Sequence, residues 1–338
     1  MPVSALTNVS DWDTLLTEIR NFLNATGDWT IHVDNASPPS GEGTTAGGRE
    51  LVVSNGVCLA GLRSTTSGPG ANRMLLFDGV PPWSVSHIDA MPNNSGISLV
   101  DGDYTNAADP INGRRTNPAF AGPFPTAFLF TDDPSTYLHV VVEVIAGRYR
   151  HFHFGNMRKF GTWTGGAYYA MTFWSQIVNV SIDIPSSSFH HTPFDAANAQ
   201  TGLETTFYYD DGTGCLWRAV TETTFNGVVR KRGHGTQRGS GMGRMFRSIQ
   251  ETPFSGLIAL QPITFWSTTT ADTPDTIRCM GQIKDVAAVN MRNLQPGQSY
   301  FIGSDEWMTF PLAQKGDPAV GLDVENSGYF GMAYLVKP

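Results

Sequence analysis

Three runs rich in β-branched and aromatic residues follow one another closely in the middle of the chain, and they constrain the fold more than any other feature. The runs cover Thr126–Thr131, Tyr137–Ile145 and Arg148–Phe154. Only the sequences DDPST and AG separate them, and DDPS and AG are typical of tight turns. Strands joined by such short connections pair in antiparallel fashion, because parallel strands need a long crossover. The segment therefore predicts an antiparallel meander.

The remainder of the chain favours the same fold class, which is mainly β. Glycine and proline are frequent among the 338 residues, with 36 and 21 copies, and only 15% of the residues are charged. This composition favours short strands joined by many turns. Val178, Val180, Ile182 and Ile184 alternate with polar residues, as in a strand with one buried face. We therefore predict an antiparallel sandwich or barrel-like body with long loops.

An amphipathic helix is predicted near the start of the chain. Ser10 is the expected N-cap, and Asn24 and Gly27 are expected to end the helix. The apolar stripe of a single helix has to be buried, so we expect it to pack on a sheet or on a partner subunit. This stripe is the first of two predicted interface regions. Its residues are Trp12, Leu15, Leu16, Ile19 and Phe22.

These patterns divide the chain into three segments. Residues 1–34 hold the N-terminal helix and a docking strand, residues 35–185 form a β domain, and residues 186–338 form a second β region. Within the β domain, residues 81–125 contain many Pro, Gly, Asn and Asp residues and little periodicity, which predicts an irregular insertion. A basic, glycine-rich loop is predicted at residues 230–247.

Basic residues gather in this glycine-rich loop, although the whole chain carries a formal net charge of -8. Such a cluster can contact an acidic protein, remain a solvated loop or contact a phosphate backbone, and we favour the protein interface. Nucleic acid is not an expected partner, since the overall charge is negative. The residues of this second predicted interface are Arg230, Lys231, Arg232, Arg238, Arg244 and Arg247.

Two histidines form the candidate metal site. On a strand, His151 and His153 share one face, while Phe152 and Phe154 share the other. The two imidazoles could bind iron or another metal, or they could hydrogen-bond to neighbours while both phenylalanines face the core. No other cofactor is indicated by the sequence. A metal site needs further ligand side chains near the imidazoles, whereas hydrogen bonding needs only polar neighbours.

Several segments resemble structural proteins of tailed bacteriophages. The first is HFHFG at residues 151–155, together with KFGTWTGGAYY at residues 159–169. The opening sequences WDTLLTEIRNFL and GDWTIH are similar to the start of those proteins, and EWMTFP and SGYFGMAYLVKP are similar to their end. The resemblance covers both ends of the chain and residues 126–170.

The resemblance implies a virion component. The low fraction of charged residues, the Gly- and Pro-rich loops and the amphipathic helix suit a subunit whose surface becomes buried on assembly. We therefore expect a tail or baseplate protein that assembles in the host cytoplasm with itself, in three- or six-fold symmetry, and with other virion proteins. A head–tail neck component and a receptor- or carbohydrate-binding tail protein are alternatives. The resembling segments carry no catalytic residues, and the chain has no GxSxG or HExxH motif, so we expect a protein that is not an enzyme. A polysaccharide depolymerase is the enzymatic alternative. Apolar runs are too short for a membrane helix, which predicts a soluble chain.

Overall fold

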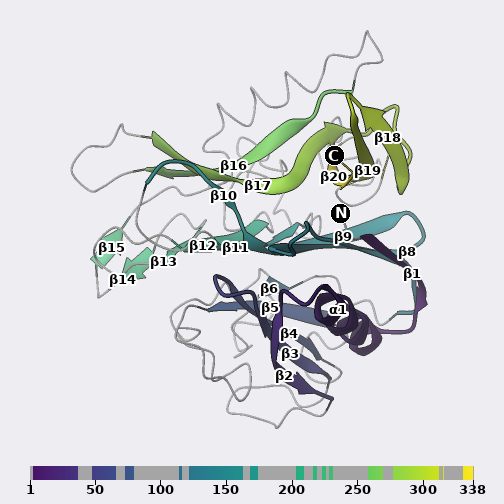
Figure 1. The fold of residues 1–338 in the computed structure, drawn as a ribbon, viewed down its shortest axis with the longest axis horizontal. Coiled ribbons are helices and arrows are strands. Elements are labelled where there is room, and N and C mark those ends of the chain that lie inside the picture. Colours follow the sequence, from purple (N-terminus) through teal and green to yellow (C-terminus); the bar gives the residue numbers. More distant parts are fainter. Residues whose placement is uncertain are drawn as a thin grey trace, which may run out of the picture.

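The computed structural model in Figure 1 is built mainly from antiparallel strands, and its helix, α1, lies near the N-terminus. This confirms the predicted fold class, although no sheet closes into a barrel in the part of the chain that is described. The structure describes residues 3–36, 48–65, 73–79, 114–115, 122–162, 168–173, 203–208, 216–218, 223–225, 228–230, 258–268, 277–311, 315 and 330–337.

A central sheet contains the predicted meander. Strands β7, β8 and β9 pair in antiparallel order, with Phe128 opposite Val141 and Val140 opposite Phe152. The N-terminal strand pairs with β7 at one edge, and β11 continues the sheet beyond β9. In spatial order the strands are β1 (Val3–Val9), β7 (Phe124–Phe130), β8 (Tyr137–Ile145), β9 (Arg148–Asn156), β11 (Tyr168–Phe173), β12 (Leu203–Tyr208) and β13 (Leu216–Arg218).

A lower sheet and the helix α1 (Trp12–Thr26) cover one face of the central sheet. The helix begins after Asp11, whose carboxylate accepts a hydrogen bond of 2.7 Å from the backbone N–H of Thr14. The lower-sheet strands are β2 (Thr30–Asn35), β3 (Glu50–Ser54), β4 (Leu59–Thr65), β5 (Arg73–Gly79) and β6 (Arg114–Arg115).

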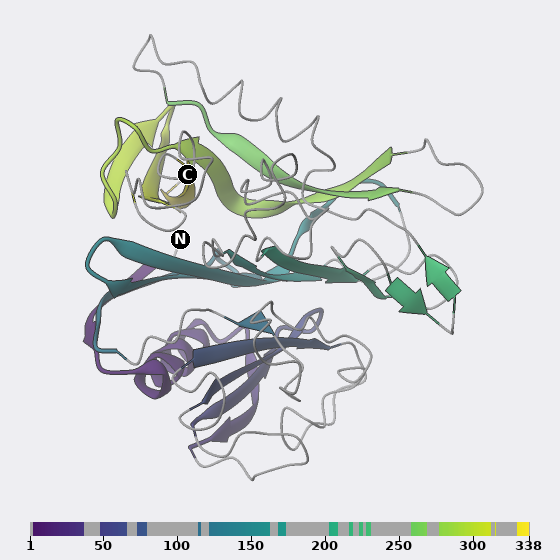
Figure 2. The ribbon, with the colours of Figure 1, turned by 180° about the vertical axis from the view of Figure 1, so that it is seen from behind.

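An upper sheet covers the opposite face of the central sheet. Its strands are β10 (Arg158–Lys159), β16 (Gln261–Thr268), β17 (Ile277–Asn290), β18 (Gln298–Ile302), β19 (Asp305–Pro311) and β20 (Phe330–Lys337). A separate hairpin pairs β14 (Thr223–Phe225) with β15 (Val228–Arg230). Figures 1 and 2 show the resulting stack of three layers from opposite sides. Central strands β8 and β9 are accordingly buried along most of their length.

The predicted limits of the helix are nearly correct. Gly27 adopts a left-handed conformation with φ of 77°, and its N–H donates to the carbonyl oxygen of Asn24, as expected for a helix C-terminus. The predicted N-cap is wrong by one residue, because Asp11 caps the helix while the hydroxyl group of Ser10 lies 2.6 Å from that of Thr14. Both residue types are good caps, and the extended backbone of Asp11 selects it.

The apolar stripe of the helix packs inside the chain, which corrects one of the two interface predictions. Trp12, Leu15, Leu16 and Ile19 are at most 3% exposed and belong to the core between the central sheet and the lower layer. Phe22 is partly buried against the same core. Of the two alternatives for the stripe, docking on a sheet is therefore confirmed, and a binding surface for a partner subunit at these residues is wrong.

Strand pairing connects all three segments into which the sequence was divided. Strand β1 of residues 1–34 pairs with β7, and β12 of residues 186–338 pairs with β11. Strand β10 of residues 35–185 pairs with β17 of the upper sheet. The segments therefore share sheets. The predicted insertion at residues 81–125 lies largely outside the described residues.

Candidate functional site

The two faces of the central sheet carry different chemistry, because alternate residues of β8 and β9 point to opposite sides. Toward the helix and the lower sheet the strands present Leu138, Val140, Val142, Phe152 and Phe154. His151 and His153 lie on the other face, where both approach Tyr334 of the upper sheet. The predicted opposition of histidine and phenylalanine side chains is confirmed.

A histidine–tyrosine network, consisting of His139, His151, His153 and Tyr334, links the central sheet to the upper sheet. The Oη atom of Tyr334 lies 2.6 Å from His151 Nδ1 and 3.5 Å from His153 Nε2. His153 Nδ1 lies 3.0 Å from His139 Nδ1. All four residues are fully buried. A continuous set of polar contacts thus runs from β8 across β9 to β20.

Backbone carbonyl groups of the upper sheet determine where the protons lie in this network. His139 Nε2 is 3.0 Å from the carbonyl oxygen of Lys284, and His151 Nε2 is 2.9 Å from that of Pro311. A carbonyl oxygen only accepts hydrogen bonds, so in the neutral rings both Nε2 atoms carry the proton and both Nδ1 atoms accept. His153 Nδ1 therefore donates to His139, and the tyrosine hydroxyl donates to its nearer acceptor, His151 Nδ1.

Burial keeps the network uncharged. Loss of hydration lowers the pKa of His139 and of His151 to about 3, from an ordinary value of 6.5. The pKa of His153 is lowered well below 6.5, first by burial and then by the neighbouring imidazoles, and burial raises the pKa of Tyr334 well above its ordinary value. All four side chains are consequently neutral at pH 7. As neutral groups they can satisfy one another without a counter-ion.

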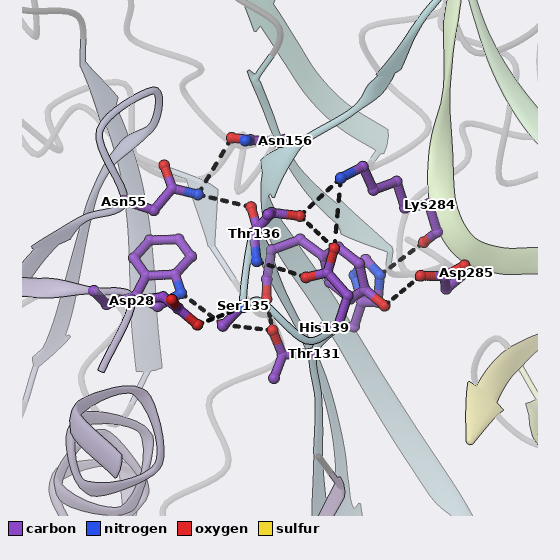
Figure 3. A network of polar contacts seen from close by, with 12 residues as sticks. Asp28, Asn55, Thr131, Ser135, Thr136, His139, Asn156, Lys284 and Asp285 are labelled. Carbon is purple, nitrogen blue, oxygen red and sulfur yellow. Dashed lines mark hydrogen bonds and ion pairs between the residues drawn. The ribbon is translucent and has the colours of Figure 1, made fainter. Parts of the chain in front are cut away.

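The turn at residues 131–136, here called the interlayer turn, connects β7 to β8 and binds the lower layer (Figure 3). Asp28 Oδ2 accepts a hydrogen bond of 2.6 Å from the backbone N–H of Ser135, and Trp29 Nε1 donates to Ser135 Oγ at 2.7 Å. Asn55 Nδ2 donates to the carbonyl oxygen of Thr136 at 2.7 Å. These bonds fix the turn to the segment after the helix and to the connection between β3 and β4.

The same turn also binds the upper sheet (Figure 3). Lys284 Nζ donates to Thr136 Oγ1 at 2.8 Å and lies 3.5 Å from Asp132 Oδ2. Next to the turn, Tyr137 Oη donates to Asp285 Oδ2 at 2.7 Å. Because the interlayer turn holds bonds on both sides, it couples the positions of all three layers. The histidine–tyrosine network begins two residues further along β8, at His139.

Only some of the predicted site residues lie in the part of the chain that the structure describes. His151 and His153 are brought together with Tyr334, which matches the hydrogen-bonding alternative. Within the described part of the chain, no group of three or more His, Cys, Asp or Glu side chains is placed to hold a metal ion, and metal binding stays a prediction. Arg230 ends β15. The remaining basic residues of the second predicted interface, Lys231, Arg232, Arg238, Arg244 and Arg247, lie outside the described residues.

Sequence reasoning missed His139, Tyr334 and Lys284. A signal for His139 was present, because it alternates with Leu138 and Val140 in a predicted strand and so had to face away from them. The positions of Tyr334 and Lys284 carried no comparable signal, since their partners lie on distant segments of the chain.

Comparison with known proteins adds no assignment, since the chain matches no protein-family model and no curated protein. In the part of the chain that the structure describes, no helix is long and apolar enough to cross a membrane. A function for this chain therefore has to be inferred from the geometry of the described residues and from the resemblance of individual segments.

Replacing Tyr334 with phenylalanine is expected to lower the free energy of unfolding by about 1–3 kcal/mol. The buried Nδ1 atom of His151 would lose its donor at 2.6 Å, and water could replace that donor only at a cost, because the surroundings are fully buried. Tyr137→Phe is the matched control, because its partner Asp285 is only partly buried and can be hydrated instead. Chemical denaturation at pH 7.5 measures both. A larger loss for Tyr137→Phe would contradict the structural role assigned to the network.

Proposed function

We propose that this protein is a non-enzymatic structural component of a bacteriophage particle, in the tail or baseplate, that assembles through protein–protein interfaces. The observation that carries this proposal is the position of the resembling segments. HFHFG lies in β9, EWMTFP lies in β19, and the resemblance at the C-terminal end includes β20. These three strands supply His151, Pro311 and Tyr334 to a single buried contact. The most distinctive segments therefore hold sheets together.

The chemistry of the candidate site supports a structural role. Each imidazole is fully buried, and the described contacts of all three imidazoles hold one strand or layer against another. An acid–base catalyst instead needs a group that can reach a substrate and titrate near the working pH. The low pKa values of His139 and His151, about 3, favour permanently neutral hydrogen-bonding groups.

The upper sheet also offers an apolar group for assembly. Phe301, in the β18–β19 hairpin, is 77% exposed. Aromatic residues such as phenylalanine are enriched at protein–protein interfaces relative to the rest of the surface. Its neighbour Ser299 is exposed on the same strand, two residues away. This pair allows a controlled test of the surface.

Light scattering on the purified protein tests the proposal. We expect a molar mass of three or six chains, and we expect Phe301→Ser to lower that mass while Ser299→Ala leaves it unchanged. A monomer at every concentration, also in mixtures with other virion proteins, would contradict an assembly role. Binding of that monomer to host cells would favour a receptor- or carbohydrate-binding protein, and release of reducing sugars from host polysaccharide would favour a depolymerase. Metal analysis of the same sample tests binding at His151 and His153.

A further inference from the structure

Strand β18 forms a free edge of the upper sheet. It pairs with β19 on one side, and no strand in the described part of the chain pairs with its other side. A two-residue turn follows Ile302, so Ile302 and Asp305 form a hydrogen-bonded pair at the base of the hairpin. Such pairs alternate along an antiparallel ladder, and the backbone groups of Ser299 and Phe301 therefore point away from β19. Figures 1 and 2 both show β18 at the outer end of the upper sheet.

These outward backbone groups are accessible to another strand. Within the described residues, no hydrogen bond joins the backbone N–H or carbonyl group of Ser299 or Phe301 to another group. Three large apolar side chains are exposed in the same residues. Ile145 lies in β8, inside the central sheet, and Phe160 follows β10, so Phe301 is the one that lies on an edge strand. An edge with free backbone groups and an exposed aromatic ring can accept a further strand.

The other edge strands among the described residues have features that oppose such pairing. Strands β6 and β10 are two residues long and entirely basic, and β13, β14 and β15 are three residues long. Strand β2 contains a register shift and the charged Asp34, β16 contains Pro262 and two register shifts, and β1 contains Asn8 with φ of 52°. Strand β18, with the sequence QSYFI, has no charge, no proline and no register shift against β19.

The outward groups of β18 are complementary to those of a second copy of the same strand. When two such strands run antiparallel with Tyr300 facing its counterpart, Ser299 of each strand lies opposite Phe301 of the other. All of these residues point outward, so each of the two pairs can exchange two backbone hydrogen bonds. Centring the strands on Ser299 or on Phe301 would leave a single such pair within the strand. In the favoured register the two Phe301 rings are diagonal neighbours on one face, which is within reach of aromatic side chains.

Charge also favours a second copy at this edge. Although each chain carries a formal net charge of -8, two β18 strands meet without any charged side chain between them. The same arrangement at β6 or β10 would place basic residues opposite basic residues. A contact between two five-residue strands is small beside the roughly 1,000 Å² that a stable interface buries. We therefore expect it as one of several contacts in an assembly.

We propose that β18 pairs with β18 of a second copy about a two-fold axis at Tyr300, which joins two upper sheets into one continuous sheet. This inference rests on the proposed function, because it names one contact through which the chain assembles. A two-fold contact joins chains in pairs, so an assembly in which every β18 is paired contains an even number of chains. Of the two expected sizes, six chains agrees with this contact and three chains does not.

Disulfide cross-linking of the variant Tyr300→Cys tests the geometry. In the proposed register the two residues at position 300 face each other with Cα atoms about 4.5 Å apart, which a disulfide can bridge. We expect mild oxidation to give a covalent dimer as the main product. Ser299→Cys is the control, because residue 299 is more exposed but lies about 7–8 Å from its diagonal counterpart, too far for a disulfide. No more dimer than in wild type, which has three cysteines, or equal dimer in both variants, would overturn the proposal.

Ser299→Pro tests the backbone contact without a new thiol, and it decides the question if Tyr300→Cys does not fold. The N–H of Ser299 points away from β19, so its loss leaves the hairpin intact while it removes a donor from both pairs of the contact. We expect light scattering to show half the wild-type molar mass for Ser299→Pro, whereas Ser299→Ala keeps the wild-type mass. An unchanged mass for a folded Ser299→Pro variant would overturn the proposal.

The outcomes separate this inference from the proposed function. A wild-type assembly of three chains, or one of six chains that Ser299→Pro leaves intact, would overturn pairing at β18 while an assembly role still stands. A Tyr300→Cys dimer from a protein that forms no larger assembly, alone or with other virion proteins, would support the pairing and contradict the role in a virion. A monomer that gives no cross-link would contradict both.

Discussion

Replacing Gly155 with alanine is expected to lower the free energy of unfolding by at least about 3 kcal/mol. Gly155 lies in β9 with φ of 130°, a conformation that is open to glycine and strained for other residues. A Cβ atom at this position would lie 2.3 Å from Cα of Tyr137 and 2.7 Å from the carbonyl oxygen of Thr136. Both obstacles are backbone atoms, so they cannot rotate away.

The collision would also disturb the contacts between layers. Tyr137 donates to Asp285 of the upper sheet, and Thr136 accepts a hydrogen bond from Asn55 of the lower layer. A shift of β8 away from Gly155 therefore weakens both interfaces at once. The backbone of Asn156, the next residue of β9, donates to the carbonyl oxygen of Thr136 at 2.8 Å, which leaves little freedom for adjustment.

Gly147→Ala is the matched control for this prediction. Gly147 lies in the turn at the other end of the same strand pair and has φ of 76°, and a Cβ atom added there would meet no other atom within 4 Å. The expected cost is about 1 kcal/mol from backbone strain alone. Chemical denaturation of both variants at pH 7.5 provides the comparison. Equal losses would show that the close approach of Tyr137 to Gly155 does not exist in the folded protein.

Local patterns were sufficient to predict the meander and the helix. The runs that became β7, β8 and β9 are separated by turn sequences too short for any other connection, so their antiparallel pairing followed directly. The spacing of Leu15, Leu16 and Ile19 likewise identified the buried side of α1. In both cases the information lies within about 30 residues of sequence and depends on simple periodicity.

The stacking of three layers could not be predicted in the same way. In β8, the run from Leu138 to Val142 is apolar except for His139, a pattern that fits a strand buried on both faces but also many other buried segments. The identity of the covering layers depends on residues far away in sequence. The helix stripe illustrates this limit, because periodicity showed that it must be buried and could not distinguish the chain's own sheets from a partner.

In the candidate site, too, only the relations between residues close in sequence were predictable. Strand periodicity placed His151 and His153 together and opposite Phe152, because that relation is local. The hydroxyl group that joins the two histidines comes from Tyr334, 183 residues after His151. Such a contact requires β9 and β20 to lie in facing sheets, and the relative position of two sheets is a property of the whole core.

Replacing Trp12 with alanine is expected to lower the free energy of unfolding by about 3–5 kcal/mol. The indole ring is 3% exposed, and its centroid lies 4.4 Å from that of Phe124 in β7. The substitution would leave a cavity at the start of the helix, between α1 and the central sheet. Phe22→Ala, on the same helix but only partly buried, should cost less and serves as the control.

The Trp12 variant also distinguishes a core residue from an interface residue. A side chain buried within one chain affects the unfolding of that chain at any protein concentration, whereas an interface side chain affects association and makes stability depend on concentration. We therefore expect Trp12→Ala to lower stability without changing the molar mass of the folded species. The opposite outcome would be loss of the oligomer in Trp12→Ala while the unfolding of the chain stays unchanged. That outcome would make α1 a contact between subunits. The lower layer would then have to move away from the central sheet during assembly.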